Sequence, residues 1–378
     1  MSSASATLES SNRGLVTNRW IISRNDDVIW FIGSVLASYA FLVANVWLGV
    51  PVMALIWVWA LGFDGPHVYG TVSRTYADRE ERRKKAKLFY GTLMLFALGP
   101  TMVLAGRARL LGTSVWAPAF FFFASMWAYY HLVKQHYGFM ILYKKKNDDL
   151  SEFDNLIDRA FLLLGMTYPF VRFLSHGVAA QKRVPFPTRT GPFWWFESIV
   201  LLAFVVTLVI FVGRQVQKLL VHKPINGPKI LLLAAALPMH WIVLRLLEPS
   251  EYGALAVVAT LTIYHNIQYH RIIWFHNRNK YARAGAADYG LASKVNKNVW
   301  RYVVCALVFG AAYHIPHYTL VAPDGLAMGF IWGGAFTHYY LDSKIWRVRR
   351  DGELNKNLHM EATKPVVAGE PLQADAKS

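Results

Sequence analysis

Long apolar stretches dominate the chain and are separated by short polar connections. A helix needs about 20 consecutive, mainly apolar residues to cross the hydrocarbon core of a bilayer. The pattern predicts ten such spans, at residues 28–50, 51–73, 88–106, 116–143, 157–175, 193–213, 230–247, 253–276, 299–320 and 325–346. We therefore expect an all-α, polytopic integral membrane protein with about ten transmembrane helices.

Two polar ends flank the predicted transmembrane domain of residues 28–350. Residues 1–27 are expected to form an N-terminal tail. Residues 351–378 lack apolar periodicity and are expected to be a disordered C-terminal tail.

The composition excludes several classes of protein. Hydrophobic residues make up 54% of the chain and charged residues only 17%, whereas soluble domains carry about 25% charged residues. The single cysteine, Cys305, excludes a disulfide framework, a zinc ribbon and a thiolate cluster. A net charge of +17 first suggests a nucleic-acid partner, but the hydrophobicity favours a membrane instead.

The distribution of basic residues indicates an orientation. With the ten spans above and both termini in the cytoplasm, 33 of the 40 lysine and arginine residues fall on the cytoplasmic side. This asymmetry follows the positive-inside rule. The charge is then an orientation signal, so no nucleic-acid partner is needed to explain it. The expected location is the bacterial inner (cytoplasmic) membrane.

The predicted topology also gathers histidines. Seven of the 13 histidines, together with two aspartates, lie toward the cytoplasmic ends of the second, fourth, eighth and tenth spans. These residues are Asp64, His67, His131, His136, His265, His270, His276, His338 and Asp342. Ionisable side chains at membrane depth are costly and usually face partners or a cavity, and neutral imidazole is a common metal ligand. The nine residues are the predicted ligands of a metal site facing the cytoplasm.

Helix geometry limits how these residues share an ion. Positions five apart, such as His131 and His136, differ by about 140° around a helix. Such pairs suit either two adjacent metals or a helix distorted by a π-bulge. His338 and Asp342 share a face, so a carboxylate either ligates directly or orients an imidazole. His276 lies about 16 Å along the axis from His265 and is the weakest candidate.

The ligand types suit iron above all, as one or two ions, while zinc and copper stay open. The strings His131-x4-His136 and His265-x4-His270 resemble the membrane-bound histidine-box family of integral-membrane fatty acid desaturases and hydroxylases. The resemblance implies two irons held by about eight histidines, dioxygen, a lipid or isoprenoid-like substrate and an electron-donor protein. The chain departs from this family because it has no adjacent His-His pair, more spans and only seven clustered histidines.

Other functions stay open. The string Phe63-Asp64-Gly65-Pro66-His67 resembles the bacterial carotenoid-cleaving membrane dioxygenases, which makes oxidative cleavage an alternative. A metal-ion or proton-coupled transporter is the rival of another class, followed by a non-catalytic haem or quinone-binding subunit. A transport site is expected near the midplane, so the crowding of histidines at one surface favours an enzyme. The remaining membrane histidines either build a separate outer site or are structural; they are His176, His240, His314 and His317.

Overall fold

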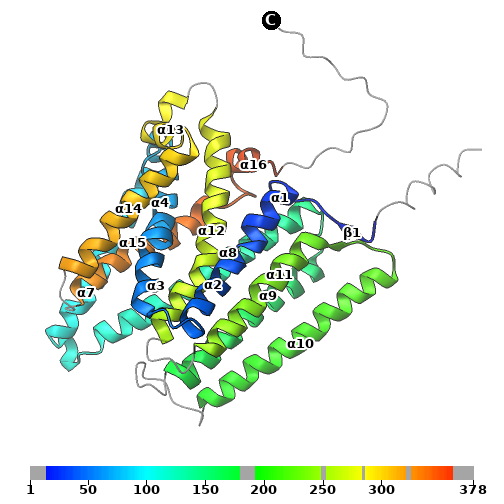
Figure 1. The fold of residues 1–378 in the computed structure, drawn as a ribbon, viewed down its shortest axis with the longest axis horizontal. Coiled ribbons are helices and arrows are strands. Elements are labelled where there is room, and N and C mark those ends of the chain that lie inside the picture. The colour runs from blue at the N-terminus through cyan, green and yellow to red at the C-terminus, as the bar shows by residue number, and fades with distance from the viewer. Residues whose placement is uncertain (1–13, 179–191, 248–252, 283–285, 321–324, 361–378) are drawn as a thin grey trace, which may run out of the picture.

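The computed structural model describes residues 14–178, 192–247, 253–282, 286–320 and 325–360 (Figure 1). Apart from two short strands, all regular structure in these ranges is helical. The elements are β1 (Val16–Thr17), α1 (Arg24–Asp26), η2 (Asp27–Gly33), α2 (Val35–Val46), α3 (Val52–Trp59), η3 (Ala60–Asp64), α4 (Gly65–Arg74), α5 (Arg79–Lys84), α6 (Ala86–Thr92), α7 (Leu95–Arg107), η4 (Leu110–Gly112), α8 (Trp116–Lys146), α9 (Glu152–Phe173), η5 (Leu174–Val178), α10 (Pro192–Leu220), β2 (Ile225–Asn226), α11 (Gly227–Leu246), α12 (Gly253–Tyr281), η6 (Ala286–Tyr289), α13 (Leu291–Val295), α14 (Val299–Leu320), α15 (Leu326–Ile345) and α16 (Gly352–Asn357).

Each of the ten predicted spans is largely helical in the described ranges. The helices α8 and α10 run past the predicted ends, to Lys146 and Leu220. Four helical segments are long and apolar enough to cross a membrane, namely Arg24–Val46, Ala86–Arg107, Trp194–Leu220 and Gly227–Leu246. The all-α class is therefore confirmed and a membrane protein is indicated, while the number of ten spans and the orientation of the termini stay predictions.

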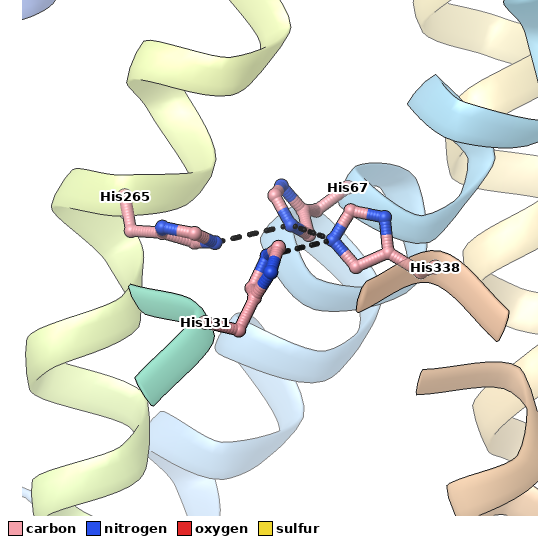
Figure 2. Close-up of side chains that lie close together, drawn as sticks. All are labelled: His67, His131, His265 and His338. Carbon is pink, nitrogen blue, oxygen red and sulfur yellow. Dashed lines mark hydrogen bonds between the residues drawn. The ribbon is translucent and has the colours of Figure 1, made fainter. Parts of the chain in front are cut away.

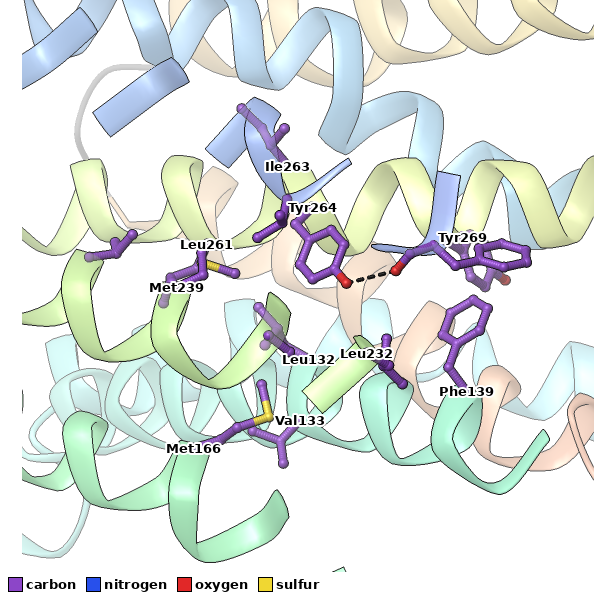
Figure 3. Packing of buried hydrophobic residues seen from close by; sticks show 14 of the residues in the cluster. Leu132, Val133, Phe139, Met166, Leu232, Met239, Leu261, Ile263, Tyr264 and Tyr269 are labelled. Atoms are coloured by element: carbon purple, nitrogen blue, oxygen red, sulfur yellow. Dashed lines mark hydrogen bonds between the residues drawn. The ribbon is translucent and has the colours of Figure 1, made fainter. Parts of the chain in front are cut away.

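The helix α12 lies in the middle of the bundle and packs against α2, α3, α4, α8 and α11 (Figure 1). Its side chains are part of the hydrophobic core, in which Ile263 and Tyr264 are fully buried and Tyr264 lies on the side of α12 that faces Leu132 and Met239 (Figure 3). By contrast, α10 lies at the edge of the bundle beside α9. Much of its apolar surface is exposed, as at Trp195 and Val209, which suits contact with lipid.

Glycines allow two helix pairs to approach closely. A Cβ atom on Gly65 would lie 2.4 Å from the Cα of Gly310, and one on Gly99 would lie 2.2 Å from the carbonyl oxygen of Gly329. Any larger residue at these positions would force the helices apart. Small residues at helix contacts are typical of membrane bundles, and these contacts hold α4 against α14 and α7 against α15.

The predicted disorder of residues 351–378 is wrong for the first part of that segment. Residues Gly352–Asn357 form α16, capped by the Asp351 carboxylate, which accepts a hydrogen bond from the Leu354 amide at 2.9 Å. Leu354, Leu358 and Met360 are buried in the main core. Three apolar residues are too few to show periodicity, yet they suffice to dock one helical turn. Residues 361–378 lie outside the described ranges.

Candidate metal centre

The position of His67 depends on the proline before it. Pro66 lacks the N–H that would bond to a carbonyl one turn earlier, and its ring crowds that carbonyl. The chain accommodates Pro66 by widening into the π-helical turn η3, directly before α4. The contact between Gly65 and Gly310 then presses this region against α14. His67 is consequently turned inward and is only 3% exposed.

Four histidines from four helices converge on one point (Figure 2). They are His67 on α4, His131 on α8, His265 on α12 and His338 on α15. The Nε2 atom of His338 lies 2.7 Å from Nε2 of His67 and 3.1 Å from Nε2 of His131. Nε2 of His265 lies 3.2 Å from Nε2 of His67. All four rings are buried, so the group is shielded from bulk solvent.

A polar network fixes the orientation of His338. The Thr71 hydroxyl donates to Oδ1 of Asp342 at 3.0 Å, and the Tyr269 hydroxyl donates to the same oxygen at 2.7 Å. The Thr71 oxygen also lies 2.6 Å from both the Tyr269 hydroxyl and Nδ1 of His338, and it accepts a hydrogen bond from Nδ1–H in the tautomer that protonates this nitrogen. The Nε2 atom of His338 is then left with a lone pair that points to the other histidines. Such a partner on the second ring nitrogen is typical of a metal-ligating histidine.

The arrangement fits one metal ion. In a tetrahedral site with metal–nitrogen distances of about 2.0–2.1 Å, the ligand nitrogens lie about 3.4 Å apart. The ligand atoms of the four histidines all lie within 4.8 Å of one another. Movements of less than about 1 Å would bring them to tetrahedral spacing. A set of four imidazoles without thiolate or carboxylate is compatible with iron, zinc and copper.

The structure brings together only the first histidine of each His-x4-His string. His136 turns its Nδ1 atom to the carbonyl oxygen of Leu132 at 3.0 Å. His270 places its Nδ1 atom 2.9 Å from the Tyr302 hydroxyl. The angle of about 140° between positions five apart explains why one ring of each string faces the centre and the other does not.

The other predicted ligands also lie away from the four nitrogens. His276 contacts Asn277 and Asn357, at 3.0 and 3.3 Å. Asp64 lies 3.1 Å from Nε2 of His314. Asp342 orients His338 through Thr71 and does not reach the centre itself. Of the two roles expected for a carboxylate, the network around Asp342 therefore supports the orienting one.

Sequence reasoning missed Thr71 and Tyr269. Each follows a clustered histidine by four residues, as Asp342 follows His338, so all three share a helix face with a ligand candidate. A search for polar residues one turn after each histidine would have found them.

Three of the four outer histidines have partners of their own. His240 contacts the Tyr129 hydroxyl at 3.0 Å, His176 contacts Glu197 at 2.9 Å and His314 pairs with Asp64. The side chain of His317 lies outside the described part of the chain. Among described residues, the four-histidine cluster is the only group of three or more His, Cys, Asp or Glu that can hold an ion.

An apolar cavity of about 530 Å³ opens onto the cluster. All four histidines contribute to its wall, and the remaining lining is mainly aromatic and aliphatic, including Phe121, Phe122, Leu261 and Trp332. A ligand in this cavity would be recognised by its apolar surface and would contact the imidazoles at one point. No protein-family model, curated protein or solved structure significantly matches this chain.

Proposed function

We propose that this protein is a membrane-embedded, non-haem iron oxygenase that acts on a long hydrophobic substrate. The observation that carries the proposal is the convergence of four buried histidines on one point in the wall of an apolar cavity. Iron bound there would supply the activation of dioxygen. The cavity would hold an apolar chain beside the centre and exclude water from it.

The number of ions affects the reaction. The two-iron centre implied by the histidine-box resemblance would need further histidines, but His136 and His270 are turned to other partners. One ion favours the dioxygenase alternative, in which a carbon–carbon double bond is cleaved and each product carbonyl receives one oxygen atom from dioxygen. That reaction needs no external electrons. Hydroxylation and desaturation would each require two electrons from a donor protein.

The protein's own groups have two roles in this proposal. Asp342, Thr71 and Tyr269 keep the His338 ring in one tautomer and orientation. Tyr339 stacks on the His131 ring, with centroids 4.4 Å apart, and also lines the cavity. A substrate chain passing the cluster would contact these rings, so their fixed positions would select which carbon lies next to the centre.

The same proposal includes the placement in the membrane. Ten spans, both termini in the cytoplasm and a centre near the inner face of a bacterial cytoplasmic membrane account for the distribution of basic residues. A reporter fused after Ser378 is expected in the cytoplasm, and one inserted within 178–190 outside. Finding both reporters on one side would contradict this topology.

The decisive test is metal analysis of the full-length protein purified in detergent, followed by reaction with ¹⁸O-labelled dioxygen. We expect about one iron per chain and label in both cleavage products. Absence of a bound transition metal would overturn the proposal. Stoichiometric zinc without iron would also overturn it and would point to hydrolysis.

A further inference from the structure

A second cavity reaches the cluster from another side. It has a volume of about 700 Å³ and lies between α8, α12, α15 and the segment that follows α15. Its walls include the apolar side chains of Trp127, Leu142, Ile272 and Trp346. His131 and Tyr339 line this cavity and the apolar cavity described above. The same pair of rings, beside the metal centre, therefore forms part of the wall of each cavity.

This second cavity carries a strong positive charge. Five basic side chains line it, namely Lys134, Lys145, Arg347, Arg349 and Arg350. Its one acidic residue, Asp342, is engaged by the hydroxyls of Thr71 and Tyr269. The cavity therefore combines apolar walls with an excess of cations.

Most of these cations have no carboxylate partner. Within the described ranges, no carboxylate lies within 4.0 Å of Lys134, Arg347, Arg349 or Arg350. Lys134 lies over the Tyr137 ring at 4.4 Å, and Arg347 donates to the carbonyl oxygen of Ser343 at 3.0 Å. Neither contact neutralises a charge. An anionic ligand would be attracted to these groups and could accept charge-assisted hydrogen bonds from them.

We infer that this cavity binds the anionic head group of an amphiphilic membrane lipid. That lipid is the substrate, and the head group is its charged end. The cations suit a carboxylate or phosphate. The apolar walls suit a hydrocarbon chain attached to that anionic group. A free inorganic anion has no chain that could contact these walls. Because His131 and Tyr339 line this cavity, a chain anchored here would lie against these two rings, next to the metal centre. The inference rests on the proposed function for the role of the ligand, but its binding can be measured without metal or turnover.

The test is binding of radiolabelled oleate to the metal-free, full-length protein in neutral detergent. Oleyl alcohol has the same chain without the charge, and inorganic phosphate is a charge without a chain. We expect oleate to bind, oleyl alcohol to bind at least about tenfold more weakly, and phosphate to compete poorly. The triple variant Arg347→Gln, Arg349→Gln and Arg350→Gln should raise the Kd for oleate by at least about tenfold.

Two matched controls make the result specific. The variant Arg82→Gln, Arg83→Gln and Lys87→Gln removes the same charge from α5 and α6 and should leave the Kd unchanged. Gly138 lines the cavity and has open space where a Cβ would be, so Gly138→Phe should weaken oleate binding by filling the cavity. Gly91 has the same open space on α6, and Gly91→Phe should have no effect.

Three outcomes would overturn the inference. These are equal binding of oleate and oleyl alcohol, displacement of oleate by phosphate at comparable affinity, and an unchanged Kd in the arginine triple variant. Because the binding assay uses metal-free protein, its result does not depend on whether the separate metal analysis finds iron. A failure of oleate binding would likewise leave the iron analysis valid.

Discussion

Two buried polar clusters in this protein differ in how their polar groups are paired. One joins α8, α9, α10 and α11 through an ionic network. Its members are Lys144, Asp149, Asp154, Asp158, Lys218 and Lys229. Lys229 contacts Asp149 at 2.7 Å and Asp158 at 2.8 Å, and Lys144 contacts Asp158 as well. Each carboxylate contacts at least one ammonium group, so the charges of the network are paired with one another.

The four-histidine cluster is different because its members are all of one kind. Four imidazole nitrogens meet at one point, and the carboxylate of Asp342 lies behind His338 rather than at the centre. Imidazole lone pairs gain most from a shared cation. The ionic network is thus paired within itself, whereas the four like donors could hold a shared cation.

The largest expected effect is loss of the metal. Replacing one of the four histidines, as in His265→Ala or His338→Ala, removes a ligand and should reduce the bound metal from about one per chain to nearly none. His136→Ala should retain the metal, because its ring faces the Leu132 carbonyl oxygen. Elemental analysis of purified variants measures both. Retention of the metal in His265→Ala and His338→Ala would show that the cluster is not the binding site, whereas equal loss in all three variants would show general misfolding.

The ionic network should respond in stability and not in metal content. Asp158→Asn would leave Lys144 and Lys229 buried with less compensation, and breaking a buried pair typically costs about 3–5 kcal/mol. Thermal unfolding in detergent should show this loss, with metal content per folded chain unchanged. The control is Asp148→Asn, which removes the exposed pair with Arg19 and should cost about 0–1 kcal/mol. Equal effects of the two variants would contradict this role for the network.

A smaller effect on metal affinity is expected behind the ligands. Asp342→Asn should weaken metal binding by about 10–100-fold without abolishing it, because it disturbs the group that orients His338. Competition with a chelator gives the affinity. Asp64→Asn, which alters the pair with His314, should change the affinity much less. A larger loss of metal affinity from Asp64→Asn than from Asp342→Asn would identify Asp64 as the carboxylate that supports metal binding.

The last prediction concerns the pH dependence of stability and a residue outside the predicted spans. Burial opposes ionisation of Glu81, but Lys280 and Lys85 outweigh it and lower its pKa to about 2 from an ordinary value of 4.5. A lowered pKa stabilises the fold above about pH 4.5, and this contribution is lost as the pH falls toward about 2. The Tm difference between the wild type and Glu81→Gln should therefore be largest near neutral pH and shrink in acid. A constant difference would contradict this assignment.

The sequence predicted the helices well and the site only in part. Apolar length alone located ten stretches that are largely helical in the described ranges. The strings around His131 and His265 named the right helices. They did not decide which histidine of each string faces inward, since this depends on how α8 and α12 are rotated against their neighbours. The α16 turn was missed because three apolar residues carry no periodicity.

The sequence by itself determined the all-α class, the helical ranges and the four helices that supply the histidines. These follow from local composition and spacing, which a single chain carries without its neighbours. Only the tertiary structure decided that four histidines share one point and that Thr71, Tyr269 and Asp342 orient one of them. It also placed a cation-rich cavity beside them. These features join residues up to 271 positions apart, such as His67 and His338, and depend on helix rotation and close packing that the sequence pattern does not specify.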